Sequence, residues 1–262
     1  MERAATGQPE QTTLMALGEL YSRLGRQRDA VKTLERIPEA ERKTVNYWFN
    51  LGVVRSKLND RAGAEQAYRR ALEIDSSDLD VLNNLGVLLF QKGEYVEAAT
   101  TFEKLSGLNP GSRSARLNCA SSLARSGELS RAVEVWKVHV RAEPNDHGTR
   151  LDLANALWQL GDRDSAKVHY QTIAASDKKN AGALNGLGLW NLEQSNLTEA
   201  ERLFRGAMAA DARFLPAYNN LAVALERLNR RQEAIVVLRK ALQIDPNYAD
   251  AKKNLERMNA AK

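Results

Sequence analysis

The stretch from Asp80 to Phe90, DVLNNLGVLLF, returns in altered form between Leu215 and Arg227 as LPAYNNLAVALER. The shared Asn-Asn-Leu core recurs after 136 residues, which is four times 34. A fixed period of a few tens of residues is typical of repeat proteins, in which each unit buries its apolar face against its neighbours. The stretch therefore predicts a chain that is built from units of 34 residues.

Positions that lie 34 residues apart hold the same kinds of side chain from Leu17 to Leu238, without an insertion. One column consists only of alanine, at Ala30, Ala64, Ala98, Ala132, Ala166, Ala200 and Ala234. A second column holds glycine or alanine, at Gly18, Gly52, Gly86, Ala120, Ala154, Gly188 and Ala222. A third column holds large residues, at Leu34, Tyr68, Phe102, Trp136, Tyr170, Phe204 and Leu238. Small residues let two helices approach closely, and the large residues fill the space between them.

The apolar spacing within one unit is helical. Leu82, Leu85 and Leu89 follow the i, i+3, i+7 spacing of one helix face. A polar break at 91–94 and a second helical pattern come next, and Pro110 marks the end of the unit. Each unit is therefore predicted to consist of a helix, a tight turn and an antiparallel helix.

These columns carry a resemblance to a known family. Two units of this sequence resemble the tetratricopeptide repeat signature. The matching residues are Trp48, Leu51-Gly52, Ala64, Tyr68 and Ala71 in one unit, and Leu85-Gly86, Ala98, Phe102 and Pro110 in the next. The resemblance implies an all-α fold, a right-handed α-solenoid superhelix of helix pairs with a C-terminal capping helix, and a role in protein–protein interaction. We expect a flexible tail at 1–10, seven units at 11–44, 45–78, 79–112, 113–146, 147–180, 181–214 and 215–248, and a capping helix and tail at 249–262.

Composition and motifs argue against an enzyme. The 262 residues carry a net charge of +5, one cysteine and three histidines. The sequence has no G-x-S-x-G, P-loop, H-E-x-x-H or paired-cysteine motif, so no catalytic residue, cofactor, metal or small-molecule substrate is expected. We interpret Cys119 as a buried packing residue and His139 as a core histidine.

The sequence also bears on the compartment. No run of residues is apolar enough to span a bilayer, so no membrane insertion is expected. The single cysteine and the polar N-terminal residues favour a cytoplasmic protein. A periplasmic or exported location stays open, because a signal segment could be missing from this chain.

A polar column on the first helix of each unit is the candidate binding site. It lies beside the buried leucine column and would line the concave groove of a superhelix. Amides offer donors and an acceptor to the backbone of an extended peptide, and adjacent apolar side chains offer contact area. The candidate residues are Asn50, Asn84, Asn118, Asp152, Asn220 and Asn254 in the polar column, and Phe49, Phe90, Leu151 and Trp158 beside it.

The polar column is similar to the asparagine ladder in the repeat superhelix of O-GlcNAc transferases, and this similarity implies binding of a polypeptide main chain. Asp152 and Gly186 interrupt the ladder in this sequence. The alternative is structural: each asparagine bonds to an adjacent repeat and fixes the angle between repeats. The two roles are compatible.

The same columns also bear on other kinds of binding partner. A clamp for chaperone tails is disfavoured, because the corresponding pairs, Met15 and Glu19 or Phe49 and Val53, lack the required lysine and asparagine. Self-association, or packing in a larger complex through the ends or the convex face, stays open, and residues 1–10 could fill a neighbour's groove. Nucleic acid, in particular RNA, is disfavoured because the basic residues concentrate on the second helices, at Arg36, Arg69, Arg70, Lys104, Lys137, Arg205, Arg239 and Lys240.

Overall fold

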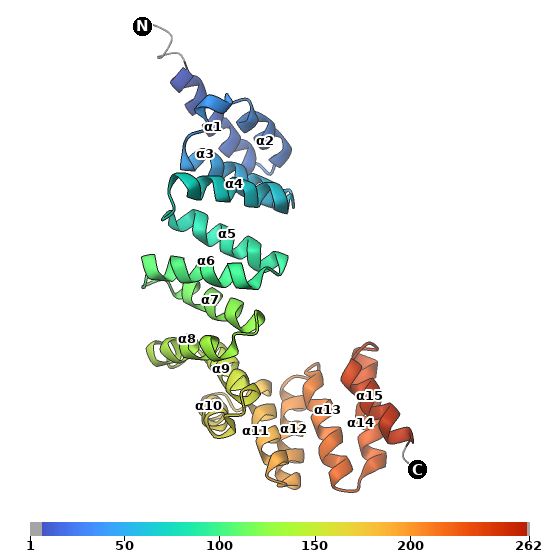
Figure 1. Cartoon of the computed structure of the whole chain (residues 1–262). Helices are drawn as coiled ribbons and strands as arrows, with labels where there is room; N and C mark the ends of the chain where they lie inside the picture. The colour runs from blue at the N-terminus through green and yellow to red at the C-terminus, as the bar shows by residue number, and fades with distance from the viewer. Residues whose placement is uncertain (1–6, 261–262) are drawn as a thin grey trace. The chain divides into compact units, whose positions relative to one another are not determined.

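A computed structural model describes residues 7–260, which form fifteen α-helices, one short 3-10 helix and no strand (Figure 1). The first helices of the pairs are α1 Gly7–Arg23, α3 Val45–Lys57, α5 Leu79–Lys92, α7 Arg113–Arg125, α9 His147–Gln159, α11 Ala181–Glu193 and α13 Leu215–Arg227. The second helices are α2 Gln27–Glu35, α4 Arg61–Ile74, α6 Tyr95–Leu108, α8 Leu129–Ala142, α10 Arg163–Ser176, α12 Leu197–Ala210 and α14 Arg231–Ile244, and α15 spans Ala249–Ala260. The predicted all-α class is confirmed.

The ends of the chain were predicted to be tails. Residues 1–6 of the expected N-terminal tail lie outside the described residues, and α1 already begins at Gly7. Residues 261 and 262, at the end of the expected C-terminal tail, also lie outside the described residues.

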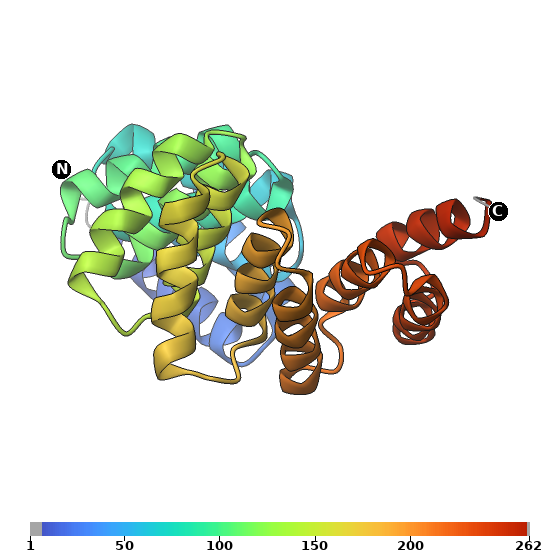
Figure 2. The ribbon, with the colours of Figure 1, turned by 90° about the horizontal axis from the view of Figure 1, so that it is seen from below.

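The structure divides into two compact units, and the division falls within α8, between Val135 and Trp136. We call the described residues up to Val135 the N-terminal half and those from Trp136 the C-terminal half. Consecutive helices pack against one another from α1 to α7 in the N-terminal half and from α9 to α15 in the C-terminal half. Figure 2 looks down the stack of the N-terminal half, so that its blue and green helices overlie one another. Each half is thus a stack of helix pairs.

The turn between the two helices of a pair is the most regular feature of the backbone. At intervals of 34 residues, one residue takes a positive φ: Gly25, Asn59, Gly93, Gly127, Gly161, Ser195 and Asn229. This left-handed conformation ends the first helix, and it costs little for glycine but about 1 kcal/mol for a residue with a Cβ atom. The polar break that the sequence predicted is therefore a helix stop with a fixed geometry.

Glycines of the small column set the distance within a pair. A Cβ atom at Gly52 would lie 2.5 Å from the Tyr68 ring, and one at Gly188 would lie 2.5 Å from the Phe204 ring. Such contacts are too short for real atoms, so the large aromatic side chain sits directly on the backbone of the facing helix. The predicted complementarity of the small and large columns is confirmed.

The first pair departs from the others in its second helix, which is shorter. Helix α2 stops at Glu35 because Pro38 has no N–H group and restricts the residue before it. A short 3-10 turn, Glu39–Glu41, follows. The Arg42 guanidinium then folds back and donates to the backbone oxygens of Glu35 and Ile37 at 2.8 and 2.9 Å. These hydrogen bonds satisfy two backbone carbonyl groups. In the longer second helices, the corresponding carbonyl groups accept hydrogen bonds within the helix.

Ion pairs link successive second helices in the N-terminal half. Arg69 on α4 donates to Glu97 on α6 at 2.5 Å. In the next interface the charges are exchanged, because Glu103 on α6 accepts from Arg131 on α8. Arg69 and Glu103 occupy the same position of the repeat, as do Glu97 and Arg131. The polarity of the pair therefore alternates from one interface to the next.

Candidate functional site

The asparagine column in the N-terminal half keeps much of its hydrogen-bonding capacity. Asn50, Asn84 and Asn118 are half-buried on α3, α5 and α7. Asn84 Nδ2 donates to the Asp80 carbonyl oxygen at 2.8 Å, one turn earlier in the same helix. The side chains of Asn50 and Asn118 make no hydrogen bond to any described residue. Both amides can therefore donate to and accept from a ligand.

A cavity of about 400 Å³ lies beside Asn118, between α5 and α7. Its apolar wall and floor are Val87, Phe90 and Phe102, and its polar rim is Gln91, Asn118 and Ser121. The half-buried Phe90 ring stands edge-to-face against Tyr95, with 5.2 Å between the ring centroids. The predicted neighbours Asn118 and Phe90 are thus brought together around one recess.

A second cavity, of about 260 Å³, lies beside Asn50, between α1 and α3. Every residue around the first cavity has its counterpart here at an offset of 68 residues, or two repeats, namely Glu19, Ser22, Arg23, Leu34, Asn50 and Val53. Phe49 adds an apolar wall, and Lys57 adds a cation. The two cavities therefore occupy the same place in the repeat, the first being mostly neutral and the second carrying charge.

The asparagines of the C-terminal half are bonded to the preceding repeat. Asn220 Nδ2 donates to Asn185 Oδ1 at 2.9 Å, which ties α13 to α11. Asn254 Nδ2 donates to Asn219 Oδ1 at 2.7 Å, which ties α15 to α13. Here the structural alternative, in which asparagines join adjacent repeats, describes the contacts.

Gly186, where the ladder is interrupted, lies against a tyrosine ring. The ring of Tyr170 lies against Gly186, so that a Cβ atom there would come within 2.4 Å of it. The Tyr170 hydroxyl group donates to Asn155 Oδ1 at 2.8 Å. Tyr170 occupies the repeat position of Phe102, and its longer side chain reaches the place where the first cavity opens in the N-terminal half.

The other predicted residues of the C-terminal half are largely occupied by the chain itself. The Arg163 guanidinium lies over the Trp158 ring, 4.2 Å from its centroid, and is held there by Glu193. Leu151 packs on Gly182, where an added Cβ would come within 2.6 Å of a Leu151 methyl group. Asp152 is exposed, and partial desolvation together with the charge of Asp146 raises the pKa of its carboxyl group. The structure thus does not gather these residues around one recess.

Cys119 and His139 are buried, as the sequence indicated. Burial raises the pKa of the Cys119 thiol to about 11, with a smaller contribution from Glu103, so the thiol stays protonated. His139 Nε2 lies 2.9 Å from Asp146 Oδ2, and the same carboxylate caps α9 through the Thr149 N–H group. Both are packing residues rather than reactive groups.

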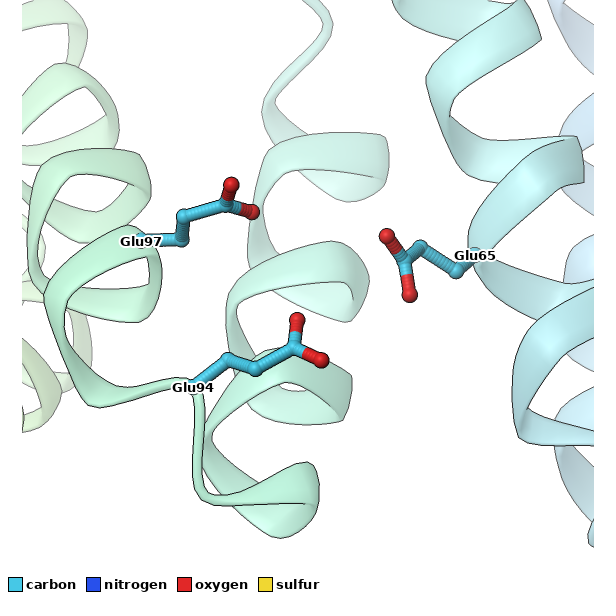
Figure 3. A group of neighbouring side chains, drawn as sticks. All are labelled: Glu65, Glu94 and Glu97. Atoms are coloured by element: carbon cyan, nitrogen blue, oxygen red, sulfur yellow. The ribbon is translucent and has the colours of Figure 1, made fainter.

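Three carboxylates, from Glu65, Glu94 and Glu97, face one another between α4 and the start of α6 (Figure 3). Two cations are interleaved with them: Lys92 bonds to Glu65 and Glu94, and Arg69 bonds to Glu65 and Glu97. Burial raises the pKa of the Glu65 carboxyl group, but the hydrogen bonds from Lys92 and Arg69 outweigh it and lower the pKa. The cluster is therefore an ion-pair network that joins neighbouring repeats.

Tandem antiparallel helix pairs with a regular period place the chain in the α-solenoid class of repeat proteins. A family model described as tetratricopeptide repeat matches residues 10–179, and further tetratricopeptide repeat models match 151–213 and 216–248. The chain belongs to the tetratricopeptide repeat family. None of the helices between residues 7 and 260 combines the length and apolarity needed to cross a bilayer.

Solved structures share the fold. MamA from Desulfovibrio magneticus RS-1 matches with a TM-score of 0.57 and 16% identity, over 65% of this chain and 97% of that chain. Cut9, in the APC/C hetero-tetramer Cut9-Hcn1, matches with a TM-score of 0.60 and 16% identity, over 95% of this chain and 48% of that chain. A thermophilic tetratricopeptide repeat protein from Thermus thermophilus matches with a TM-score of 0.57 and 22% identity, over 69% of this chain and 98% of that chain. No curated protein sequence matches the chain.

Proposed function

We propose that this chain is a non-catalytic scaffold that binds an extended or short helical peptide segment along the first helices of its N-terminal half. The observation that carries the proposal is the pair of cavities, two repeats apart, each with an unbonded asparagine at its edge. The scaffold proposed here consists of the seven units between residues 11 and 248.

The chemistry of the two cavities suits a peptide. Asn50 and Asn118 can bond to its backbone amides without reading its sequence. The recess beside Phe90 accepts an apolar side chain, whereas the recess beside Lys57 and Glu19 suits a polar or charged one. The ligand would therefore present an apolar anchor at α5–α7 and a polar residue at α1–α3. Affinity should be moderate, because ordering a flexible segment offsets part of the contact energy.

Charge pairing supports a protein partner over RNA. Of the basic residues on the second helices, Arg69 is held by Glu65 and Glu97, and Arg205 is held by Glu201. A guanidinium group that is already paired gains less from a phosphate than a free one does. A protein partner also accords with the family, and one structural neighbour, Cut9, is described in a hetero-tetramer with Hcn1.

A peptide-library selection tests the proposal. We expect the wild-type chain to enrich a motif with an apolar anchor, and Phe90→Ala and Asn118→Ala to weaken binding of that motif, Phe90→Ala by roughly tenfold or more. Trp158→Ala and Asn220→Ala are matched controls from the C-terminal half and should bind like the wild type. Circular dichroism would confirm that each variant is folded.

Two results would overturn the proposal. The absence of any enriched motif with a folded protein would remove the free-peptide hypothesis. Loss of the motif in the Trp158→Ala or Asn220→Ala variant, with binding intact in Phe90→Ala and Asn118→Ala, would move the binding centre to the C-terminal half.

A further inference from the structure

A third cavity, of about 200 Å³, lies in the C-terminal half between the loop that joins α10 to α11 and helix α12. Its floor is apolar and comes from Leu184, Leu203 and Ala210, and its rim is cationic and comes from Lys178, Lys179 and Arg202. It is built from the second helix α12, the inter-repeat loop and Leu184 near the start of α11. None of its lining residues belongs to the asparagine column, so this cavity is separate from the proposed peptide site.

The cavity lies beside a glycine of α12, Gly206, at a position where the other repeats have none. That column holds Arg70, Lys104, Val138, Thr172 and Lys240 in other repeats, whereas the column of Ala210 also holds the small residues Ala142 and Ser176. A Cβ atom at Gly206 would lie 3.5 Å from a Leu184 methyl group, which is an ordinary contact. Glycine within a helix costs about 1 kcal/mol relative to alanine. Packing therefore gives no reason for glycine at this position.

The facing loop departs from the pattern as well. Lys178 and Lys179 occupy positions that are uncharged in several other repeats, as in Ser76-Ser77, Pro110-Gly111, Pro144-Asn145 and Pro246-Asn247. Both lysines are exposed and make no ion pair with any described residue. The nearby acids are engaged elsewhere: Glu199 bonds to Arg202, and Asp177 accepts from the Lys179 N–H group and from Asn180. Two unneutralised cations therefore stand at the rim of an apolar recess.

We propose that this cavity is a second docking site, which takes an acidic segment of a partner protein. An aliphatic side chain of the segment enters the recess on Leu184 and Leu203, and flanking carboxylates pair with Lys178 and Lys179. The observations favour an acidic peptide over a nucleic acid, because the lining offers aliphatic surface and no aromatic ring on which a base could stack.

Fluorescence polarisation with a labelled GELEELEG peptide tests this site. The double variant Lys178→Glu/Lys179→Glu should weaken binding roughly tenfold at low ionic strength, and added salt should weaken the wild type in the same direction. The matched control is Lys252→Glu/Lys253→Glu, which makes the same charge change on two adjacent exposed lysines of α15 and should leave binding unchanged.

Gly206 gives a test that does not depend on charge. Gly206→Leu places a side chain in the recess and should weaken peptide binding roughly tenfold, while the melting temperature stays at or above that of the wild type. Unchanged binding in this folded variant would overturn the proposal, as would equal losses in the two lysine double variants. Binding of a single-stranded oligonucleotide in place of the peptide, lost in Lys178→Glu/Lys179→Glu, would overturn it in favour of a nucleic acid.

Discussion

The two halves of the molecule use the same asparagine column differently. In the N-terminal half, Asn118 stands unbonded at the edge of a cavity. In the C-terminal half, Asn220 and Asn254 are bonded to asparagines of the preceding repeat. The partner residue alone does not decide the outcome, since Asn83 is available to Asn118 at the same offset of 35 residues. An asparagine in this column can therefore form hydrogen bonds in either half, and the neighbouring side chains decide whether it bonds to the chain itself.

The largest expected effect comes from restoring the ladder in the C-terminal half. Gly186→Asn would drive a Cβ atom into the Tyr170 ring, so we expect a loss of about 3 kcal/mol in the free energy of unfolding, measured by urea denaturation. The reverse exchange in the N-terminal half, Asn84→Gly, should cost only about 0.4 kcal/mol of helix propensity, because asparagine is itself a poor helix former. Combining Gly186→Asn with Tyr170→Leu should recover part of the loss. Equal stability of Gly186→Asn and the wild type would show that Tyr170 is free to move.

Removing the amide partner in each half sharpens the comparison directly. Asn185→Ala leaves Asn220 without its acceptor and should lower the free energy of unfolding by about 1 kcal/mol. Asn83→Ala, at the equivalent place, should change it by only about 0.3 kcal/mol, because Asn83 makes no side-chain bond to the described residues. Urea denaturation measures both. Equal losses in the two variants would mean that the N-terminal asparagines are also joined in solution.

The left-handed residue of the turn differs between one repeat of each half, and a single substitution can exchange it. The turn after α5 has Gly93 at this position, whereas the turn after α11 has Ser195 with a φ of 61°. Ser195→Gly should raise the free energy of unfolding by about 0.5 kcal/mol. Glycine removes the strain of a serine in the left-handed conformation, and this gain exceeds the loss of the exposed hydrogen bond that Arg227 donates to the Ser195 hydroxyl group. Gly93→Ser, as the opposite change, should lower it. A destabilised Ser195→Gly variant would show that the Arg227 bond outweighs the backbone.

The smallest expected effect concerns acid sensitivity. The pKa of the Glu65 carboxyl group is lowered in the folded chain, so its ionised form stabilises the fold near neutral pH. This stabilisation is lost as the pH falls below about 4.5 and through the lowered pKa. Glu65→Gln should therefore reduce the fall in urea midpoint between neutral and acidic pH. Glu233→Gln should reduce it less, because the Glu233 side chain is 53% exposed and that of Glu65 is 18% exposed. An equal reduction in both would assign the effect to net charge alone.

The sequence predicted the fold in detail because packing that repeats every 34 residues requires side chains of similar size at that spacing. The alternation of small and large columns indicated which helices touch. Periodicity could not indicate which asparagines are bonded, since that depends on offsets between side chains of neighbouring repeats. The cavities were missed for a related reason: they lie over Leu34 and Phe102, and only the structure shows that the Tyr170 ring fills the equivalent place in the C-terminal half.

Trp190 shows the same limit at a single residue. Its column holds the smaller residues Val54, Leu88, Ala156 and Ala224 in other repeats, so the repeat pattern does not account for a tryptophan there. In the structure, the ammonium group of Lys167 lies 3.5 Å from the centroid of the Trp190 ring. The tryptophan is therefore matched by a cation from the preceding helix, a pairing that no single column of the repeat records.

The alternating ion pairs of the second helices also constrain how such a chain can be rearranged. Arg69 meets Glu97, and Glu103 meets Arg131, with the signs exchanged between one interface and the next. If the segments 45–78 and 79–112 traded places, Arg69 would face Arg131, and two like charges would meet where an attraction had been. The repeats are thus alike in shape but not interchangeable, and their sequential order is encoded in the signs of their surface charges.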